Sequence, residues 1–141
     1  MLIAVSVNKP DLLVEISEMF GRSKYFVIHK STDNRTEFLL NPYLTELGGA
    51  GIQSARFLFE KNIDAVITTN IGINPLSFFN SLNIKVYFFS NGSAEEALKL
   101  FKEKKLKEIE INENELYTKR NRKRFRRNSS NDIIIKHHNK L

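Results

Sequence analysis

The chain has 141 residues, of which 41% are hydrophobic, with 11 phenylalanines, no cysteine and a net charge of +6. This length and apolar content predict one domain with a packed core. The lack of cysteine excludes disulfides and thiolate-ligated metal or iron–sulfur sites. No apolar run reaches the eighteen or so residues of a membrane span, and the N-terminus lacks the basic region of a signal peptide. These features predict a cytoplasmic protein without a membrane span.

The positive charge is concentrated at the C-terminal end of the chain. Residues 116–141 hold nine of the 22 Lys and Arg residues but only one of the 16 Asp and Glu residues. This segment therefore has a net charge of +8, and residues 1–115 have a net charge of −2. We predict a folded domain over residues 1–112 and a basic, disordered tail over residues 113–141.

Strands dominate the beginning of the chain. Residues 2–7 are apolar except for Ser6, as expected for a strand that is buried on both faces. Residues 24–30 and 37–40 are rich in aromatic and apolar side chains, and a polar turn at residues 32–35 separates them. This pattern predicts a β-hairpin.

Helices and strands alternate further along the chain. Residues 63–68 and 84–89 are apolar runs typical of buried strands. The helix between them is expected to begin at Asn74 and Pro75, as the N-cap and a first-turn proline. A capping box at residues 93–96 (Ser-Ala-Glu-Glu) predicts the start of a further helix.

The order of these elements indicates the fold class and the expected position of a ligand. Five strands interleaved with helices predict an α/β fold, in which a mixed five-stranded sheet lies between two layers of helices. In such sheets the ligand crevice lies at the carboxyl ends of the parallel strands. Those ends lead here into residues 8–17, 68–74 and 89–92.

A glycine-rich turn, Gly48-Gly49-Ala50-Gly51, comes directly before an apolar helical pattern. Backbone N–H groups in such a turn, together with the positive end of the helix dipole, suit an anion. Alternatively, the glycines serve only to allow close packing. The turn lacks the Lys-Ser/Thr pair of a P-loop, so a nucleotide-phosphate site of that type is not predicted.

Several short motifs, in this order and spacing, resemble the dinitrogenase iron–molybdenum cofactor biosynthesis family of NifX/NafY-type carriers and their small archaeal and bacterial relatives. The resemblance covers residues 1–106. The matching pieces are Ser17-x-x-Phe20-Gly21-Arg22 with Tyr25-Phe26, Asn41-Pro42, Gly48-Gly49-Ala50-Gly51-Ile52-Gln53, Asp64-Ala65-Val66-Ile67, Asn70-Ile71-Gly72, Asn83-Ile84-Lys85-Val86-Tyr87, Glu95-Glu96-Ala97-Leu98 and Lys105-Leu106.

The resemblance implies a ribonuclease-H-like, three-layer α/β/α fold of the nitrogenase accessory factor type. It also implies a non-catalytic role, in which the protein binds or carries an iron–sulfur or iron–molybdenum-type cofactor or its precursor. The partners that it implies are cofactor-assembly proteins. A cluster with several negative charges suits backbone N–H groups and the Arg22 guanidinium. The implied cofactor-binding residues are Ser17, Met19, Phe20, Gly21, Arg22, Gly48, Gly49, Gly51, Asn70 and Gly72.

One position departs from the family pattern. Many members have a histidine before the Phe-Gly pair, where this chain has Met19. A thioether is a weaker ligand than imidazole and favours soft metals. The predicted domain contains one histidine, His29, whose place on a predicted strand indicates a packed or surface residue. The identity of a metal-ligating side chain therefore stays open.

A second hypothesis assigns the function to the tail. Its cations, with Phe125 among them, suit nucleic-acid phosphates, and the alternative is a solvated tail without a specific partner. The candidate residues are Lys119, Arg120, Arg122, Lys123, Arg124, Arg126 and Arg127.

Catalysis is not predicted. A nuclease of the ribonuclease-H type needs several acids that converge on metal ions near the first strand, and residues 1–7 contain none. Ser17 has no nearby histidine in the sequence to activate it as a nucleophile. We therefore expect a binding protein and not an enzyme.

Overall fold

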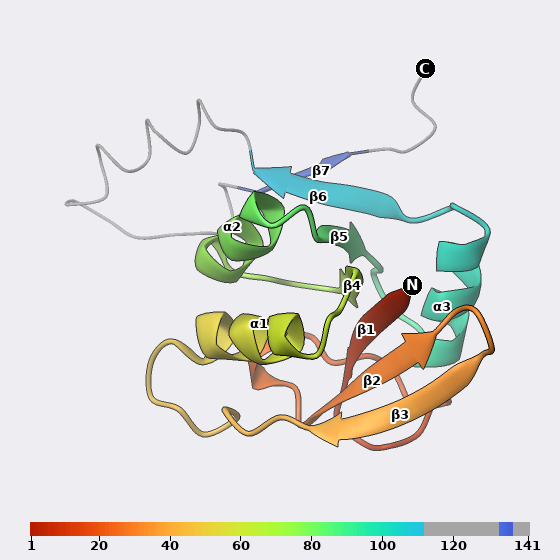
Figure 1. Cartoon of the computed structure of the whole chain (residues 1–141), viewed down its shortest axis with the longest axis horizontal. Coiled ribbons are helices and arrows are strands. Elements are labelled where there is room, and N and C mark those ends of the chain that lie inside the picture. Colours follow the sequence, from red (N-terminus) through yellow and green to blue (C-terminus); the bar gives the residue numbers. More distant parts are fainter. Residues whose placement is uncertain (112–132, 137–141) are drawn as a thin grey trace.

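A seven-stranded mixed sheet forms the middle layer of the protein in the computed structural model, which describes residues 1–111 and 133–136 (Figure 1). The strands are β1 (Leu2–Val7), β2 (Tyr25–Lys30), β3 (Arg35–Leu40), β4 (Ala65–Thr68), β5 (Lys85–Phe88), β6 (Lys107–Ile111) and β7 (Ile133–Lys136). The helices are the short 3₁₀-helix η1 (Phe20–Arg22) and the α-helices α1 (Ala50–Glu60), α2 (Ile73–Ser81) and α3 (Ala94–Lys102).

The centre of the sheet is parallel and its margins are antiparallel. The spatial order is β3-β2-β1-β4-β5-β6-β7. Strands β1, β4 and β5 are parallel to one another, whereas β2, β3, β6 and β7 each pair antiparallel to a neighbour. The three parallel strands therefore end on one side of the sheet, at Val7, Thr68 and Phe88. We call this side the carboxyl edge.

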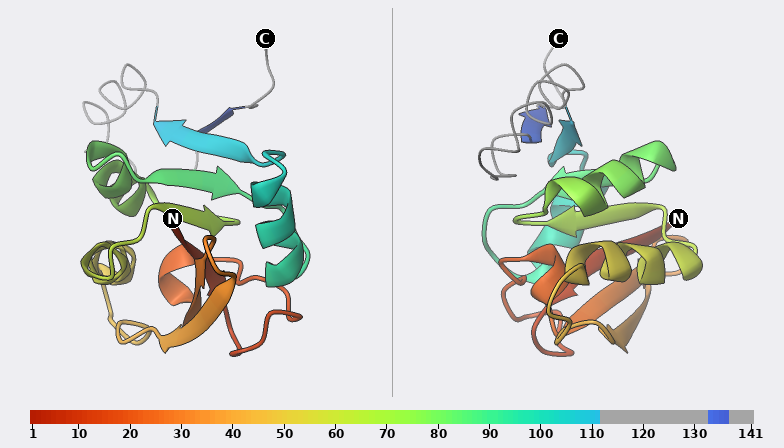
Figure 2. Two further views of the ribbon diagram at one scale, coloured as in Figure 1. Left: turned by 45° about the vertical axis from the view of Figure 1, so that its right-hand side comes forward. Right: turned by 90° about the vertical axis from the view of Figure 1, so that its left-hand side faces the viewer.

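Helices cover both faces of the sheet. Helices α1 and α2 lie side by side on one face, and α3 lies on the other (Figure 2). Leu58 of α1 and Leu76 of α2 are fully buried in one apolar cluster, and Leu98 of α3 is buried in the other. Alternation along β1 directs Ala4 into the first cluster and Val5 into the second. Full burial of a leucine side chain contributes about 1.5–3 kcal/mol to folding.

The three-layer α/β/α arrangement with a mixed sheet is confirmed, but the predicted strand count of five is wrong. The sheet has six strands within residues 1–111, and β7 adds a seventh. The sequence of β6, Lys-Glu-Ile-Glu-Ile, is compatible with either a last short strand or a frayed chain end, because its isoleucines alternate with acids and only Ile109 is buried. β7 pairs with β6 through the register Ile111↔Ile133.

The domain boundary expected at residue 112 stays a prediction. The expected disorder of the tail is wrong for residues 133–136, which pair with β6 as strand β7, and stays a prediction for its other residues. Residues 112–132 and 137–141, which include all seven cations of the nucleic-acid hypothesis, lie outside the described residues.

Among the residues that the structure describes, no helix is long and apolar enough to cross a membrane.

Two of the predicted helix starts, those of α3 and α2, had different outcomes. The capping box of α3 is confirmed, since the Ser93 hydroxyl accepts the Glu96 N–H at 3.1 Å and a Glu96 oxygen accepts the Ser93 N–H at 2.9 Å. The N-cap predicted at Asn74 is wrong, because α2 begins at Ile73 and Gly72 is its N-cap. The sequence signal was misleading because Pro75 lies within the first turn without being its first residue.

Candidate functional site

Three segments that are distant in sequence meet at the carboxyl edge: residues 17–22, the start of α1, and residues 70–72. The Phe20 N–H donates to the Asn70 carbonyl at 2.9 Å, and the Asn70 side-chain amide donates to the Glu18 carbonyl at 3.0 Å. These two bonds join the first and third segments. Phe20 itself is buried and packs edge-on against Phe79 of α2, with ring centroids 5.5 Å apart.

Glycine at positions 21 and 51 allows the first segment to lie against the start of α1. A Cβ atom on Gly21 would be 2.7 Å from both the Cα and the nitrogen of Gly51. A Cβ atom on Gly51 would in turn be 3.1 Å from Cγ of Pro75, in the first turn of α2. The first turns of α1 and α2 are therefore in contact. Close packing accounts for glycine at these two positions without a ligand.

Both helices begin without a side-chain cap. Gly49 is the N-cap of α1 in the left-handed conformation (φ 75°), and Gly72 is the N-cap of α2 in the extended region. Neither first turn contains an acidic residue. The first N–H groups of a helix have no acceptor within the helix, and they attract anions. The carboxyl edge thus combines two adjacent helix starts that no side chain of the described residues closes.

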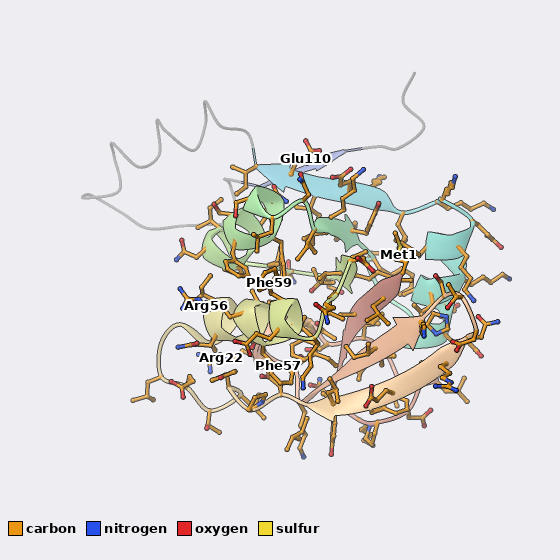
Figure 3. The ribbon with its side chains drawn as sticks, in the orientation of Figure 1. Met1, Arg22, Arg56, Phe57, Phe59 and Glu110 are labelled. Atoms are coloured by element: carbon orange, nitrogen blue, oxygen red, sulfur yellow. The ribbon has the colours of Figure 1, made fainter. Side chains whose placement is uncertain are left out.

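Arg22 holds the loop that leads to α1. Its Nη1 donates to the carbonyls of Leu44 and Glu46, at 3.0 and 2.8 Å. The side chain is exposed and lies beside α1 (Figure 3). A guanidinium has five N–H donors, and these two bonds use those of Nη1. Three donors of Arg22 therefore have no acceptor among the described residues.

Asn41 fixes the other end of this loop. It is buried, and its amide donates to the Ser23 carbonyl at 2.9 Å. Its side-chain oxygen accepts the Tyr43 N–H at 3.0 Å and the Ser54 hydroxyl at 3.3 Å. Asn41 belongs to the Asn41-Pro42 motif, and the sequence alone predicts no role for its side chain. A polar residue before a proline signals a turn, but it does not reveal a partner in α1.

The site offers few side chains that could ligate a metal. No group of three or more His, Cys, Asp or Glu residues in the described part of the chain could hold a metal ion. Ser17 is buried, with its hydroxyl directed to the Met19 carbonyl at 3.3 Å. Met19 is 47% exposed and supplies a thioether. The donor set fits an anion held by N–H groups and Arg22 better than a directly coordinated metal ion.

His29 lies away from these loops, under the C-terminal end of α3. It is buried on β2, and its Nδ1 is 3.2 Å from the Thr36 hydroxyl. Burial and the nearby Lys102 ammonium lower the pKa of His29 from its ordinary value of 6.5, and they outweigh the opposite effects of Asn34 and Asp33. The structure thus agrees with the expectation of a packed residue.

The structure brings together most of the residues predicted for the site. Residues 17–22, Gly49, Gly51, Asn70 and Gly72 are connected by the contacts above. Gly48 has no neighbour within 4 Å of an added Cβ atom and lies in the exposed approach to α1. Sequence reasoning missed the open start of α2 at Ile73, for which the glycine at position 72 was the available signal.

The fold and this edge define a small three-layer α/β protein whose candidate site is built mainly from backbone groups. Comparison with known proteins identifies the family. The model of the dinitrogenase iron-molybdenum cofactor family matches residues 1–104, and the chain belongs to this family. The resemblance found in the sequence is confirmed. The uncharacterized protein MJ0580 of Methanocaldococcus jannaschii is 33% identical over 98 residues, which cover 67% of this chain and 83% of that protein.

Solved structures show the same fold. The apo form of the orange protein from Desulfovibrio gigas superposes with a TM-score of 0.71 and 24% identity, over 74% of this chain and 89% of its own. A Thermotoga protein, TM1290, described as a candidate NifB protein, gives a TM-score of 0.68 and 28% identity over 76% and 91% of the two chains. The structure of PH0822 superposes with a TM-score of 0.63 and 28% identity, over 77% of this chain and 96% of its own.

Proposed function

We propose that this protein is a non-catalytic accessory protein of the cytoplasm, which binds and carries an anionic iron–sulfur or iron–molybdenum-type cofactor or its precursor. Family membership over residues 1–104 is the observation that carries the proposal. The Thermotoga protein, which is 28% identical to this chain and is described as a candidate NifB protein, supports the same proposal. We also propose that the sheet is ribonuclease-H-like, because it contains the order β3-β2-β1-β4-β5 with β2 antiparallel to β1.

The cofactor-binding edge comprises the three segments at the ends of β1 and β4. N–H groups at the starts of α1 and α2 donate to the anion, and the unused donors of Arg22 add a positive charge. Charge-assisted hydrogen bonds of this kind are about twice as strong as neutral ones. Buried Phe20 and the Gly21–Gly51 contact keep the segments in place. Met19 is the one sulfur ligand of these segments, and its exposure leaves it accessible.

Anaerobic loading tests the proposal. The full chain is incubated with iron and sulfide, or with isolated iron–molybdenum cofactor, and desalted, and the visible absorption and bound metal are measured. We expect a coloured product with metal in a fixed ratio to protein. A colourless, metal-free product, under conditions that load a family member with histidine before the Phe-Gly pair, would contradict the proposal.

A histidine at position 19 tests the location of the site. Met19→His adds an imidazole at the exposed N-cap of η1, so we expect it to increase metal retention after desalting. Leu13→His is the matched control, because Leu13 is also exposed but lies outside the three segments. Equal retention by the two variants would mean that the loop before η1 is not part of the site.

A further inference from the structure

Strand β3 forms one edge of the sheet. It pairs with β2 on one side, and no other helix or strand of the described residues lies beyond it (Figure 1). Edge strands of natural proteins usually carry a proline, a lysine, a bulge or a covering element that prevents further pairing. β3 has neither proline nor lysine, and its register with β2 runs from Arg35 to Leu40 without a bulge. This edge is therefore able to accept another strand.

The backbone groups on the outer side of β3 belong to Thr36, Phe38 and Leu40. Successive residues of a strand direct their N–H and C=O groups to opposite sides. The Asn41 N–H donates to the Lys24 carbonyl at 2.9 Å, so the odd-numbered residues of β3 direct their groups toward β2. The three even-numbered residues direct theirs outward, and no backbone hydrogen bond from another described residue reaches them.

The side chains of the same three residues share the face of the sheet that α3 covers. Phe38 packs against the apolar cluster on this face, and side chains two residues apart point the same way. Phe38 is only partly buried, and Leu40 is 59% exposed. A strand placed beside β3 would cover apolar surface as well as satisfy the outer backbone groups.

We propose that β3 pairs antiparallel with β3 of a second copy of this chain, about a two-fold axis at Phe38. In this register Phe38 lies opposite Phe38 of the second copy, and Thr36 lies opposite Leu40 of the second copy. Residues opposite each other exchange both of their outer hydrogen bonds. All outer groups of the strand are then satisfied, and the sheets of the two copies become continuous.

Charge and strand length favour this register over its neighbours. With the axis at Phe38, Glu37 lies opposite Leu39 of the second copy, and Arg35 lies opposite Asn41. An axis at Glu37 would place the two Glu37 carboxylates directly opposite each other, which is destabilising. An axis at Thr36 or Leu39 would leave one end of the strand unpaired. The strand is thus complementary to itself in one register.

The dimer does not depend on the proposed cofactor function, because β3 shares no residue with the cofactor-binding edge. Pairing along one short strand buries less surface than the roughly 1,200–2,000 Å² of a standard interface. We therefore expect a dimer whose population rises with protein concentration.

Disulfide cross-linking measures the register, because the chain contains no cysteine of its own. In Phe38→Cys the two Cα atoms would lie about 5.5 Å apart, within the disulfide range of about 4.4–6.8 Å. In Leu40→Cys they would lie about 14 Å apart, since the two positions are offset along the strands. In air-equilibrated buffer, we expect Phe38→Cys to form a covalent dimer at least about tenfold faster, although residue 40 is more exposed. Equal rates, or a faster Leu40→Cys, would overturn the proposal.

A second pair of variants covers the case in which Phe38→Cys is unfolded by circular dichroism. Thr36→Cys and Leu40→Cys lie opposite each other in the proposed register. An equimolar mixture of the two should form the mixed covalent dimer at least about tenfold faster than either self-dimer. A random distribution of the three products would contradict the proposal.

Sedimentation equilibrium of the full chain tests the dimer without cross-linking. The weight-average mass should rise above the 16.4 kDa of one chain as the concentration increases. Leu40→Pro removes an outer N–H that β2 does not use, so its dissociation constant should be at least about tenfold higher. Phe59→Gln is the control, since Phe59 is an exposed apolar residue of α1 and its loss should leave the dimer unchanged. A monomeric wild type, or a dimer lost in Phe59→Gln and kept in Leu40→Pro, would overturn the proposal.

Discussion

The starts of the three α-helices differ in how their first N–H groups are satisfied. α3 closes its own start with the Ser93–Glu96 capping box and has two acids in its first turn. α1 and α2 have Gly49 and Gly72 as N-caps, with no side-chain cap and no acid in the first turn. The closed start is explained by folding alone, because it stabilises an exposed helix end. The open starts face each other across the Gly51–Pro75 contact and leave their donors to water or to a bound anion.

The contact that joins the open starts to η1 should be the most sensitive to substitution. Gly21→Ala would place a Cβ atom 2.7 Å from the backbone of Gly51, so η1 or α1 must shift. We expect a loss of about 2–3 kcal/mol in the free energy of unfolding, measured by urea denaturation followed by circular dichroism. Cofactor loading should fall as well, because the two segments separate.

Gly48→Ala is the matched control for this prediction. It adds the same methyl group in the same region, but no atom lies within 4 Å of the new Cβ. The free energy of unfolding should change by less than about 0.5 kcal/mol. If both variants had the same stability, the close packing of η1 on α1 would not be important for folding.

Removing the capping box of α3 should lower the free energy of unfolding moderately and leave cofactor loading unchanged. Ser93→Ala removes the hydroxyl that accepts the Glu96 N–H, which should cost about 1 kcal/mol. Thermal and urea unfolding measure this loss, with Ser81→Ala as a control at the exposed end of α2. Anaerobic loading of Ser93→Ala should equal that of the wild type. A parallel loss of loading would show that α3 takes part in the cofactor site.

Much of the fold could be predicted from local patterns. The strands β1, β2 and β4, and the capping box of α3, follow from apolar runs and from Ser and Glu at helix-start spacing. The sequence of β6 predicts a strand less clearly, since its charged residues are also typical of a frayed chain end. Its strand conformation depends on pairing with β5 through the register Val86↔Ile109, which is a tertiary contact.

The candidate site was predictable only as a set of loops. The carboxyl ends of the parallel strands indicated residues 8–17, 68–74 and 89–92, because topology places such ends together. Residues 17–22 and 70–72 were implied by the family resemblance. The partners of individual residues were not predictable, since they arise from packing between distant segments. Arg22 was expected to face an anion, and two of its donors instead bind the carbonyls of Leu44 and Glu46. Only the structure shows which donors remain.

The end of α3 should respond to pH, unlike the open starts, which contain no titratable side chain in their first turns. Burial and Lys102 lower the pKa of His29 from 6.5 in the folded state. The unfolded chain therefore binds the proton more readily, and the free energy of unfolding should decrease as the pH falls below 6.5. Urea denaturation between pH 5 and 7.5 measures this decrease, and His29→Gln should reduce its slope. Identical slopes for both proteins would exclude His29 as the cause.

Adding a side-chain cap at the start of α2 should have the smallest effect on stability and a clear effect on cofactor binding. Gly72→Asp places a carboxylate at an N-cap whose extended backbone suits it, and the nearest atom to the new Cβ is 3.7 Å away. The side chain can accept the Asn74 N–H, since Pro75 has none. We expect stability to increase by about 0.5 kcal/mol from the cap and the helix dipole. Metal retention after loading should fall about tenfold, because the new charge repels the anion and occupies a donor. Gly72→Asn supplies a similar cap without charge and should lose less. If Gly72→Asp retained the cofactor like the wild type, the start of α2 would be open for a reason other than binding, and α1 with Arg22 would be the part of the edge to test next.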